Sequence, residues 1–138
     1  MLLDTCVISE IVRPRGSQRV KDRVAAFQPE DVYLSVVTIG EMTRGVALLA
    51  AGNKRRRFDA ALLRLEQDYA DRILPVDTDT AKIWGELDVA RQRAGLSRSV
   101  ADGLIAATAK RHGLHVVTRN VRDFEGSGVL VTNPWEDA

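Results

Sequence analysis

Short apolar segments alternate with stretches of helical periodicity, and this alternation constrains the fold more than any other feature. The short apolar segments, which we expect to be strands, are 2–3, 32–37, 73–76, 114–117 and 129–131. Between them, apolar residues recur at helical spacing. Strands separated by helices predict a parallel sheet, reached through right-handed crossovers and covered by helices on both faces. We therefore expect an α/β fold in three layers, with a central parallel sheet of about five strands, as a single domain over residues 1–138.

Capping and turn residues set the expected helix boundaries. A short helix over Thr5–Val12 ends at the Arg13-Pro14-Arg15-Gly16 turn, because proline disfavours helix at the residue before it. Thr38 and Glu41 have the spacing of a capping box, which predicts a helix from there to about Ala51. The stretch 99–112 is apolar on more than one side, which predicts a central, well-buried helix. The remaining helices are expected over 18–27, from 54 to 69 and after 77.

Composition excludes several classes of protein. Hydrophobic residues make up 45% of the 138 residues, enough for a core, and the formal net charge of +1 does not indicate a general nucleic-acid binder. The single cysteine, Cys6, excludes an intrachain disulfide and a zinc site built on thiolates. No apolar run approaches the roughly 20 residues that a membrane-spanning helix needs. We expect a soluble, cytoplasmic protein with no membrane partner.

Three acidic residues share one structural context in the predicted fold. Asp4, Glu41 and Asp102 each lie at the start of an expected helix, after a strand or a polar turn. Helix starts that follow parallel strands gather at one edge of the sheet, where ligands bind in open α/β folds. Asn120 and Asp123 follow the strand 114–117 and are expected at the same edge. The sequence therefore predicts a cluster of acidic and amide side chains there.

Such a cluster needs a counter-charge. Two carboxylates about 4 Å apart repel by about 4 kcal/mol at an effective dielectric constant of about 20, so they take up protons or bind a cation. Mg²⁺ suits oxygen ligands and keeps several waters, and Mn²⁺ is the expected substitute. The alternative is that the acids only cap helices: Asp4 by itself, Glu41 with Thr38, and Asp102 with Ser99.

Five motifs in this chain resemble those of the PIN-domain family, within it the VapC/FitB-like toxin ribonucleases of toxin–antitoxin pairs. They occur in the family order and cover nearly the whole chain. In this sequence they are Leu2-Leu3-Asp4-Thr5-x-Val7-Ile8-Ser9-Glu10, Tyr33-Leu34-Ser35-x-Val37-Thr38-x-x-Glu41, Ser99-Val100-Ala101-Asp102-x-x-Ile105-Ala106-Ala107, Thr118-Arg119-Asn120-Val121-x-Asp123-Phe124 and Asn133-Pro134-Trp135.

The resemblance implies a metal-dependent endoribonuclease that leaves 5′-phosphate and 3′-hydroxyl ends. Asp4, Glu41 and Asp102 match the family's metal-binding acids. Asn120 falls on a fourth position that is often Asp and is the fourth catalytic candidate, because Asn still offers a neutral oxygen. Cys6 departs from the family, which has Asn there, and a thiol is a weaker hydrogen-bonding group than an amide. The expected supporting or substrate-binding residues are Thr5, Ser99, Thr118, Arg119 and Asp123.

The resemblance also implies partners. These are an RNA substrate, a cognate VapB/FitA-like antitoxin and a second copy of the chain in a homodimer, with DNA reached only through the antitoxin. Lys54–Arg57 and Arg122 are further candidates for contact with RNA phosphates. His112 and His115 are expected to be structural.

Two other functions remain open at this stage. A weakly active or inactive PIN-like module that acts through its antitoxin and DNA is favoured by Asn120 and Cys6, and the three retained acids argue against it. The second of these functions is that of a phosphate-handling α/β domain. A phosphatase of the haloacid type needs an acid where Cys6 stands, and a receiver needs an acidic pair and a later lysine that are not found. Cys6 as a nucleophile lacks an identifiable base.

Overall fold

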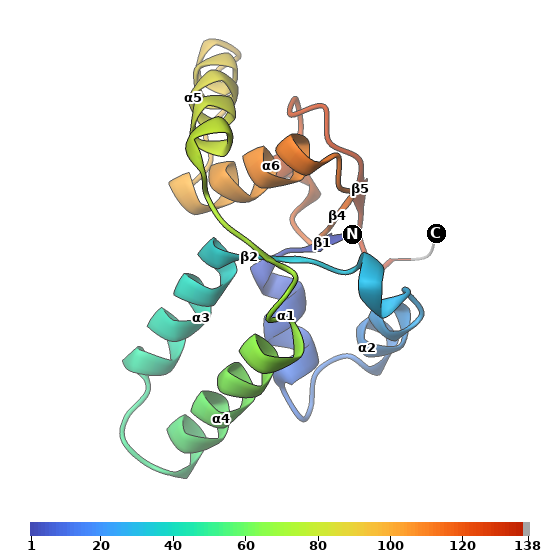
Figure 1. The fold of residues 1–138 in the computed structure, drawn as a ribbon, viewed down its shortest axis with the longest axis vertical. Coiled ribbons are helices and arrows are strands. Elements are labelled where there is room, and N and C mark those ends of the chain that lie inside the picture. The colour runs from blue at the N-terminus through green and yellow to red at the C-terminus, as the bar shows by residue number, and fades with distance from the viewer. Residues whose placement is uncertain (137–138) are drawn as a thin grey trace.

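The computed structural model describes residues 1–136 and consists of five short strands among six α-helices (Figure 1). The strands are β1 (Leu2–Leu3), β2 (Leu34–Ser35), β3 (Ile73–Leu74), β4 (Val116–Val117) and β5 (Val131–Thr132). The helices are α1 (Thr5–Val12), α2 (Gln18–Ala25), α3 (Val36–Leu48), α4 (Asn53–Asp68), α5 (Thr78–Arg93) and α6 (Val100–His112). Two 3-10 turns, η1 (Pro29–Asp31) and η2 (Val121–Phe124), complete the order.

All strand pairings are parallel, as predicted, but the sheet is divided. One part has the order β1-β4-β5 and the other pairs β2 with β3. A single parallel bridge between Leu2 and Tyr33 joins the two parts. Each strand is only two residues long. β1 and β2 are short because the capping residues Asp4 and Ser35 begin helices directly after them. The expected α/β class is therefore confirmed, with a smaller sheet than the apolar segments suggested.

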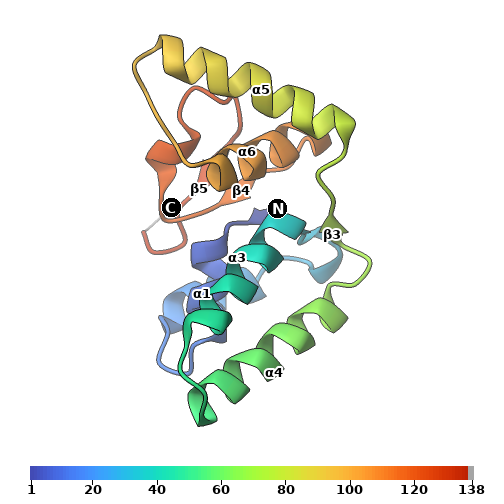
Figure 2. The same ribbon diagram turned by 90° about the vertical axis from the view of Figure 1, so that its left-hand side faces the viewer.

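The two faces of the sheet carry separate apolar clusters, and neighbouring residues of a strand supply opposite faces. Leu3 and Val117 pack with residues of α1, α2 and α4, whereas Leu2 and Val116 pack with α5 and α6. Figures 1 and 2 show α1 to α4 on one side of the strands and α5 and α6 on the other. The predicted central helix is α6, whose Ile105 and Ala106 are fully buried.

The start of α3 differs from the sequence prediction. The β-branched run 32–37 indicated a strand through Val37, but the helix begins at Val36, and Ser35 Oγ accepts a hydrogen bond from the Val37 amide at 3.0 Å. Thr38 is therefore inside the helix, and the predicted capping box with Glu41 is wrong. This correction moves Thr38 and Glu41 into adjacent turns of α3, where both face α1 through Thr5.

Among the helices of residues 1–136, none combines the length and the apolar character needed to cross a membrane.

Candidate active site

Asp4 is held at the point where β1 ends and α1 begins. Its backbone amide donates to the Val117 carbonyl at 3.0 Å, which continues the pairing of β1 with β4. Its Oδ1 accepts the Thr5 amide at 2.8 Å, so Asp4 is the N-cap of α1, as the capping alternative proposed. Only 3% of the residue is exposed. Capping occupies one carboxylate oxygen and leaves the other for a separate set of contacts.

Those contacts come from the segment after β4 and from Cys6 of α1. Thr118 Oγ1 donates to Asp4 Oδ2 at 2.7 Å and accepts the Asn120 backbone amide at 3.0 Å. The Cys6 thiol lies 3.7 Å from Asp4 Oδ2 and 3.5 Å from Thr118 Oγ1. Thr118 is fully buried, so its hydroxyl is a fixed element of the site. The recorded contact of Asn120 in this cluster is made by its backbone.

Burial and one neighbouring acid determine the electrostatics of Asp4. Burial raises the pKa of the Asp4 carboxyl above its usual range, and the charge of Asp102 raises it further. The hydrogen bonds from Thr118 and the Thr5 amide act in the opposite direction. Burial and the charge of Asp102 likewise raise the pKa of Asp123, against the lowering effect of Arg91 and Arg98. Asp102 is therefore electrostatically coupled to both other aspartates.

Glu41 reaches the site through Thr5. The Thr5 hydroxyl donates to Glu41 Oε1 at 2.7 Å and lies 3.1 Å from the hydroxyl of Thr38. Glu41 is exposed on α3. With Thr5 it lines a cavity of about 280 Å³ between α1, α3 and α4, whose other lining is mostly apolar and includes Met42 and Phe58. The site thus opens onto an apolar hollow on one side.

The third acid lies at the start of α6. Ser99 is the N-cap, and its Oγ accepts a hydrogen bond from the Asp102 amide at 3.1 Å. This is one of the two hydrogen bonds of the predicted capping box between Ser99 and Asp102. Arg98 Nη1 donates to the Asp123 carbonyl at 3.0 Å, which ties the turn before α6 to η2. Sequence reasoning missed Arg98 and Arg91, because neither belongs to a recognisable motif.

The structure brings most of the predicted site residues together. Hydrogen bonds link Asp4, Thr5, Glu41, Thr118 and the amide of Asn120, and electrostatic coupling adds Asp102 and Asp123. The Arg119 side chain is an exception: its guanidinium lies over the ring of Trp135, 5.1 Å from the centroid.

A divalent cation fits this donor set through a pair of carboxylates rather than a closed cage. Within residues 1–136 no three His, Cys, Asp or Glu side chains converge closely enough to hold a metal ion by themselves. In the same part of the chain no Lys or Arg forms an ion pair with Asp4 or Asp102. Mg²⁺ is usually bound by one or two carboxylates, with waters and substrate phosphate completing its shell. Two coupled aspartates that form no ion pair with a Lys or Arg in this part of the chain match that requirement.

Parallel strands between two helical layers, with a buried aspartate at the strand ends and further acids beside it, define a PIN domain. A model of this family, described as PIN domain, matches residues 1–126, and the chain belongs to that family. It is 43% identical to Toxin FitB of Neisseria gonorrhoeae, with 99% of each chain covered. It is also 37% identical to VapC ribonuclease Y4jK of Sinorhizobium fredii, over 100% of this chain and 99% of the relative. The resemblance inferred from the sequence motifs is confirmed.

Solved structures agree with this assignment. A structure of FitAB bound to an IR36 DNA fragment contains a chain that matches with a TM-score of 0.93 and 40% identity, covering 99% of this chain and 96% of that chain. FitAcB from Neisseria gonorrhoeae matches with a TM-score of 0.86 and 43% identity, over 97% of both chains.

Proposed function

We propose that this chain is the toxin of a toxin–antitoxin pair and acts as an endoribonuclease that requires Mg²⁺, with Mn²⁺ as a substitute. Support comes from its similarity to Toxin FitB and to a VapC ribonuclease over nearly their full lengths. The observation that carries the proposal is the buried Asp4 carboxylate at the strand ends, bonded by Thr118 and coupled to Asp102. The products of cleavage carry 5′-phosphate and 3′-hydroxyl ends.

Asp4 and Asp102 are the residues that would hold the metal, whereas Glu41, predicted as a third ligand, is not close enough to both to complete a three-acid site within residues 1–136. When bound, the cation neutralises the acids, activates water and stabilises the charge that develops on a phosphodiester during in-line attack. Thr118 keeps Asp4 Oδ2 in one orientation, which fixes the carboxylate before the substrate arrives. Fixed ligands of this kind lower the reorganisation needed for the reaction.

Glu41 serves as the proton acceptor in this proposal. It is exposed and can exchange protons with solvent, whereas Asp4 is buried. Its Oε1 accepts the Thr5 hydroxyl, which orients the carboxylate and leaves Oε2 to take the proton of the attacking water. Asn120 contributes its backbone amide to the Thr118 hydroxyl and so supports the site indirectly.

A cognate VapB/FitA-like antitoxin is the proposed regulator. The related chains of the FitAB and VapBC structures are solved as complexes, several of them with DNA. The apolar hollow that begins at Thr5 and Glu41 is the proposed place for an antitoxin segment, because apolar side chains bound there would close the approach to Glu41. DNA is reached only through the antitoxin, and the toxin itself forms a homodimer.

RNA cleavage by the purified, antitoxin-free protein tests the proposal. The wild type is incubated with a broad RNA pool and Mg²⁺ or Mn²⁺, beside a chelator control and the Asp102→Asn variant. Asp59→Asn is the matched control, because Asp59 is exposed on α4 and outside the site. We expect cleavage by the wild type and Asp59→Asn alone, with 5′-phosphate ends confirmed by ligation.

An alternative function is a PIN-like module that binds its antitoxin and DNA without catalysis. It is favoured by the neutral Asn120 and by the long thiol contact of Cys6 with Asp4. Equal inactivity of the wild type and Asp102→Asn on RNA, with intact antitoxin binding by both, would replace the nuclease proposal with this one.

A further inference from the structure

The side chain of Arg119 turns away from the acids, although its backbone lies between Thr118 and Asn120 in the site. Its guanidinium carbon is 5.1 Å from the centroid of the Trp135 ring, a cation–π geometry. Its charge also contributes to lowering the pKa of Glu10, a residue of α1. Stacking on Trp135 therefore connects the loop after β4 to the segment around Trp135, and Glu10 lies within range of the Arg119 charge.

The Trp135 end of this connection is itself fixed. Pro134 is buried, and the Trp135 amide donates to Asn133 Oδ1 at 2.9 Å. The Trp135 side chain packs against the apolar cluster beneath α1 and α2. Arg23 of α2 donates to the backbone carbonyl of Glu136, which holds the segment from the other side. The ring is thus an anchor, not a loose terminal side chain.

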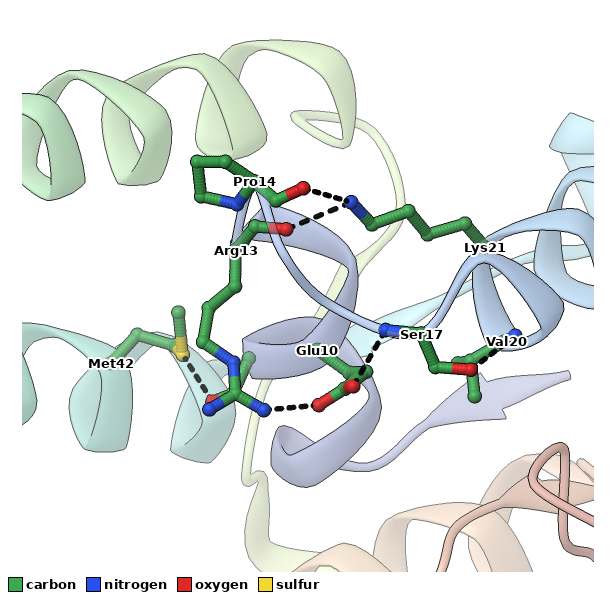
Figure 3. Close-up of polar contacts among 8 residues, drawn as sticks. Glu10, Arg13, Pro14, Ser17, Val20, Lys21 and Met42 are labelled. Carbon is green, nitrogen blue, oxygen red and sulfur yellow. Dashed lines mark hydrogen bonds and ion pairs between the residues drawn. The ribbon is translucent and has the colours of Figure 1, made fainter.

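The Glu10 carboxylate is held by its own contacts (Figure 3). Glu10 Oε1 accepts the Ser17 amide at 2.7 Å, and Oε2 forms an ion pair with Arg13. Lys21 donates to the Arg13 carbonyl at 2.8 Å, so the turn between α1 and α2 is closed around this carboxylate. The Glu10 side chain is only 13% exposed. Arg119 thus stacks on an anchored ring, and the carboxylate whose pKa its charge helps to lower is held in place by other groups.

From this geometry we infer that Arg119 is a positioning residue: its stacking on Trp135 holds the Thr118–Asn120 loop, and through it the hydroxyl that orients Asp4. The inference rests on the proposed nuclease function for its consequence in catalysis, but its structural part stands without it. It also gives the closing Asn133-Pro134-Trp135 motif a role in the active site. The competing role for Arg119 is direct contact with an RNA phosphate.

Hydrogen exchange at the Asn120 amide measures the order of this loop without any substrate. This amide donates to Thr118 Oγ1. In Trp135→Leu we expect the exchange rate of the Asn120 amide, divided by that of the Ile105 amide in α6, to rise about fivefold. A change of this size corresponds to the loss of one exposed cation–π contact. Trp135→Phe keeps a ring and should restore protection to within about twofold, because phenylalanine still offers a π-face.

Tyr69→Leu is the matched control. Arg72 stacks on Tyr69 at 4.6 Å from the ring centroid, a contact of the same kind between α4 and β3. This variant removes a cation–π pair that has no contact with the loop, and the ratio of Asn120 to Ile105 exchange should stay unchanged. An unchanged ratio in Trp135→Leu as well would overturn the inference.

Arg119→Gln separates positioning from phosphate contact. Positioning predicts a lower kcat for RNA cleavage with KM within about twofold, and an unchanged salt dependence of single-stranded RNA binding measured with chelator present. A lost phosphate contact instead reduces the slope of log K against log salt by about 0.7. A smaller salt slope together with an unchanged exchange rate at Asn120 would show that Arg119 contacts an RNA phosphate and does not position the loop. If the wild type cleaves no RNA, the nuclease proposal fails, and the exchange measurement still decides the positioning role.

Discussion

The hydroxyl of Thr118 donates to Oδ2 of Asp4 at 2.7 Å, and this bond joins residues 114 positions apart in the chain. Both residues are buried, so the pair is a fixed part of the protein interior as well as of the candidate site. The bond connects the end of β1 to the end of β4 through side chains, beside the backbone bond from the Asp4 amide to the Val117 carbonyl. The same hydroxyl group therefore contributes to stability and, under the proposed function, to the geometry of the active site.

Replacing Thr118 by Val tests this dependence. The change keeps the shape of the side chain and removes the donor to a buried carboxylate, so the free energy of unfolding should fall by about 2 kcal/mol at neutral pH. The pKa of Asp4 should rise further, because one of the groups that lowers it is lost. Urea denaturation and NMR titration of the Asp4 carboxyl carbon measure the two effects. Thr118→Ser keeps the hydroxyl, and an equal rise of the Asp4 pKa in that control would contradict the assignment.

Coupling among the aspartates predicts a change in two pKa values from one substitution. In Asp102→Asn the pKa values of Asp4 and Asp123 should both fall, because the charge of Asp102 raises each of them. Addition of Mg²⁺ to the wild type should lower the pKa of Asp4 in the same direction, and a chelator should reverse it. Carboxyl NMR titrations of the metal-free and Mg²⁺-loaded protein check both statements. No movement of the Asp4 pKa on loading with Mg²⁺ would exclude it as a ligand.

Glu10 predicts a specific pH dependence of stability. The Ser17 amide and the Arg13 ion pair hold the pKa of Glu10 below its usual 4.5. A folded-state pKa below the unfolded value gives stabilisation that is present above pH 4.5 and is lost as the pH falls through the folded pKa. Glu10→Gln should therefore be less stable than the wild type at pH 6, and the difference should close in acid.

Thermal unfolding of Glu10→Gln across this range provides the measurement. Glu30→Gln, a change at an exposed glutamate of η1, is the control. A gap between wild type and Glu10→Gln that stayed constant down to the most acidic samples would show that the carboxylate contacts do not contribute.

Two glycines in different surroundings predict opposite effects of substitution by Ala. At Gly16, in the turn between α1 and α2, a Cβ would overlap the Glu10 carbonyl oxygen, a backbone atom that cannot move aside without distorting the end of α1. We expect Gly16→Ala to lose about 3 kcal/mol of unfolding free energy.

Gly40 lies within α3, and a Cβ there meets no atom within 4 Å. Gly40→Ala should therefore gain about 1 kcal/mol from helix propensity. Urea denaturation of both variants measures these changes in unfolding free energy. Equal stability of Gly16→Ala and Gly40→Ala would show that the turn between α1 and α2 relaxes around the methyl group added at Gly16.

Sequence patterns sufficed for the fold class, because apolar alternation and caps are local signals. They also pointed to Asp4, Glu41 and Asp102, since each acid follows a strand or a polar turn. The start of α3 was mispredicted because Val36 and Val37 are β-branched, and the cap at Ser35 outweighs their preference for a strand. The division of the sheet was not predictable either, because strand length depends on how soon each cap begins a helix.

The orientation of side chains lay beyond the sequence for a different reason. Arg119 adjoins the predicted site in the chain, so a contact with phosphate was a natural expectation. Its stacking partner Trp135 comes sixteen positions later and belongs to another motif. Arg98 was overlooked because its contact with the Asp123 carbonyl pairs two segments with no shared pattern.

The neighbours of β1 determine when the candidate site is completed during synthesis. Asp4 is made well before Val117 and Thr118, the residues that hold its backbone and its carboxylate. A growing chain therefore carries its first acid without the strand and hydroxyl that orient it. The candidate site therefore stays incomplete on the ribosome until the segment after β4 has folded against the end of β1.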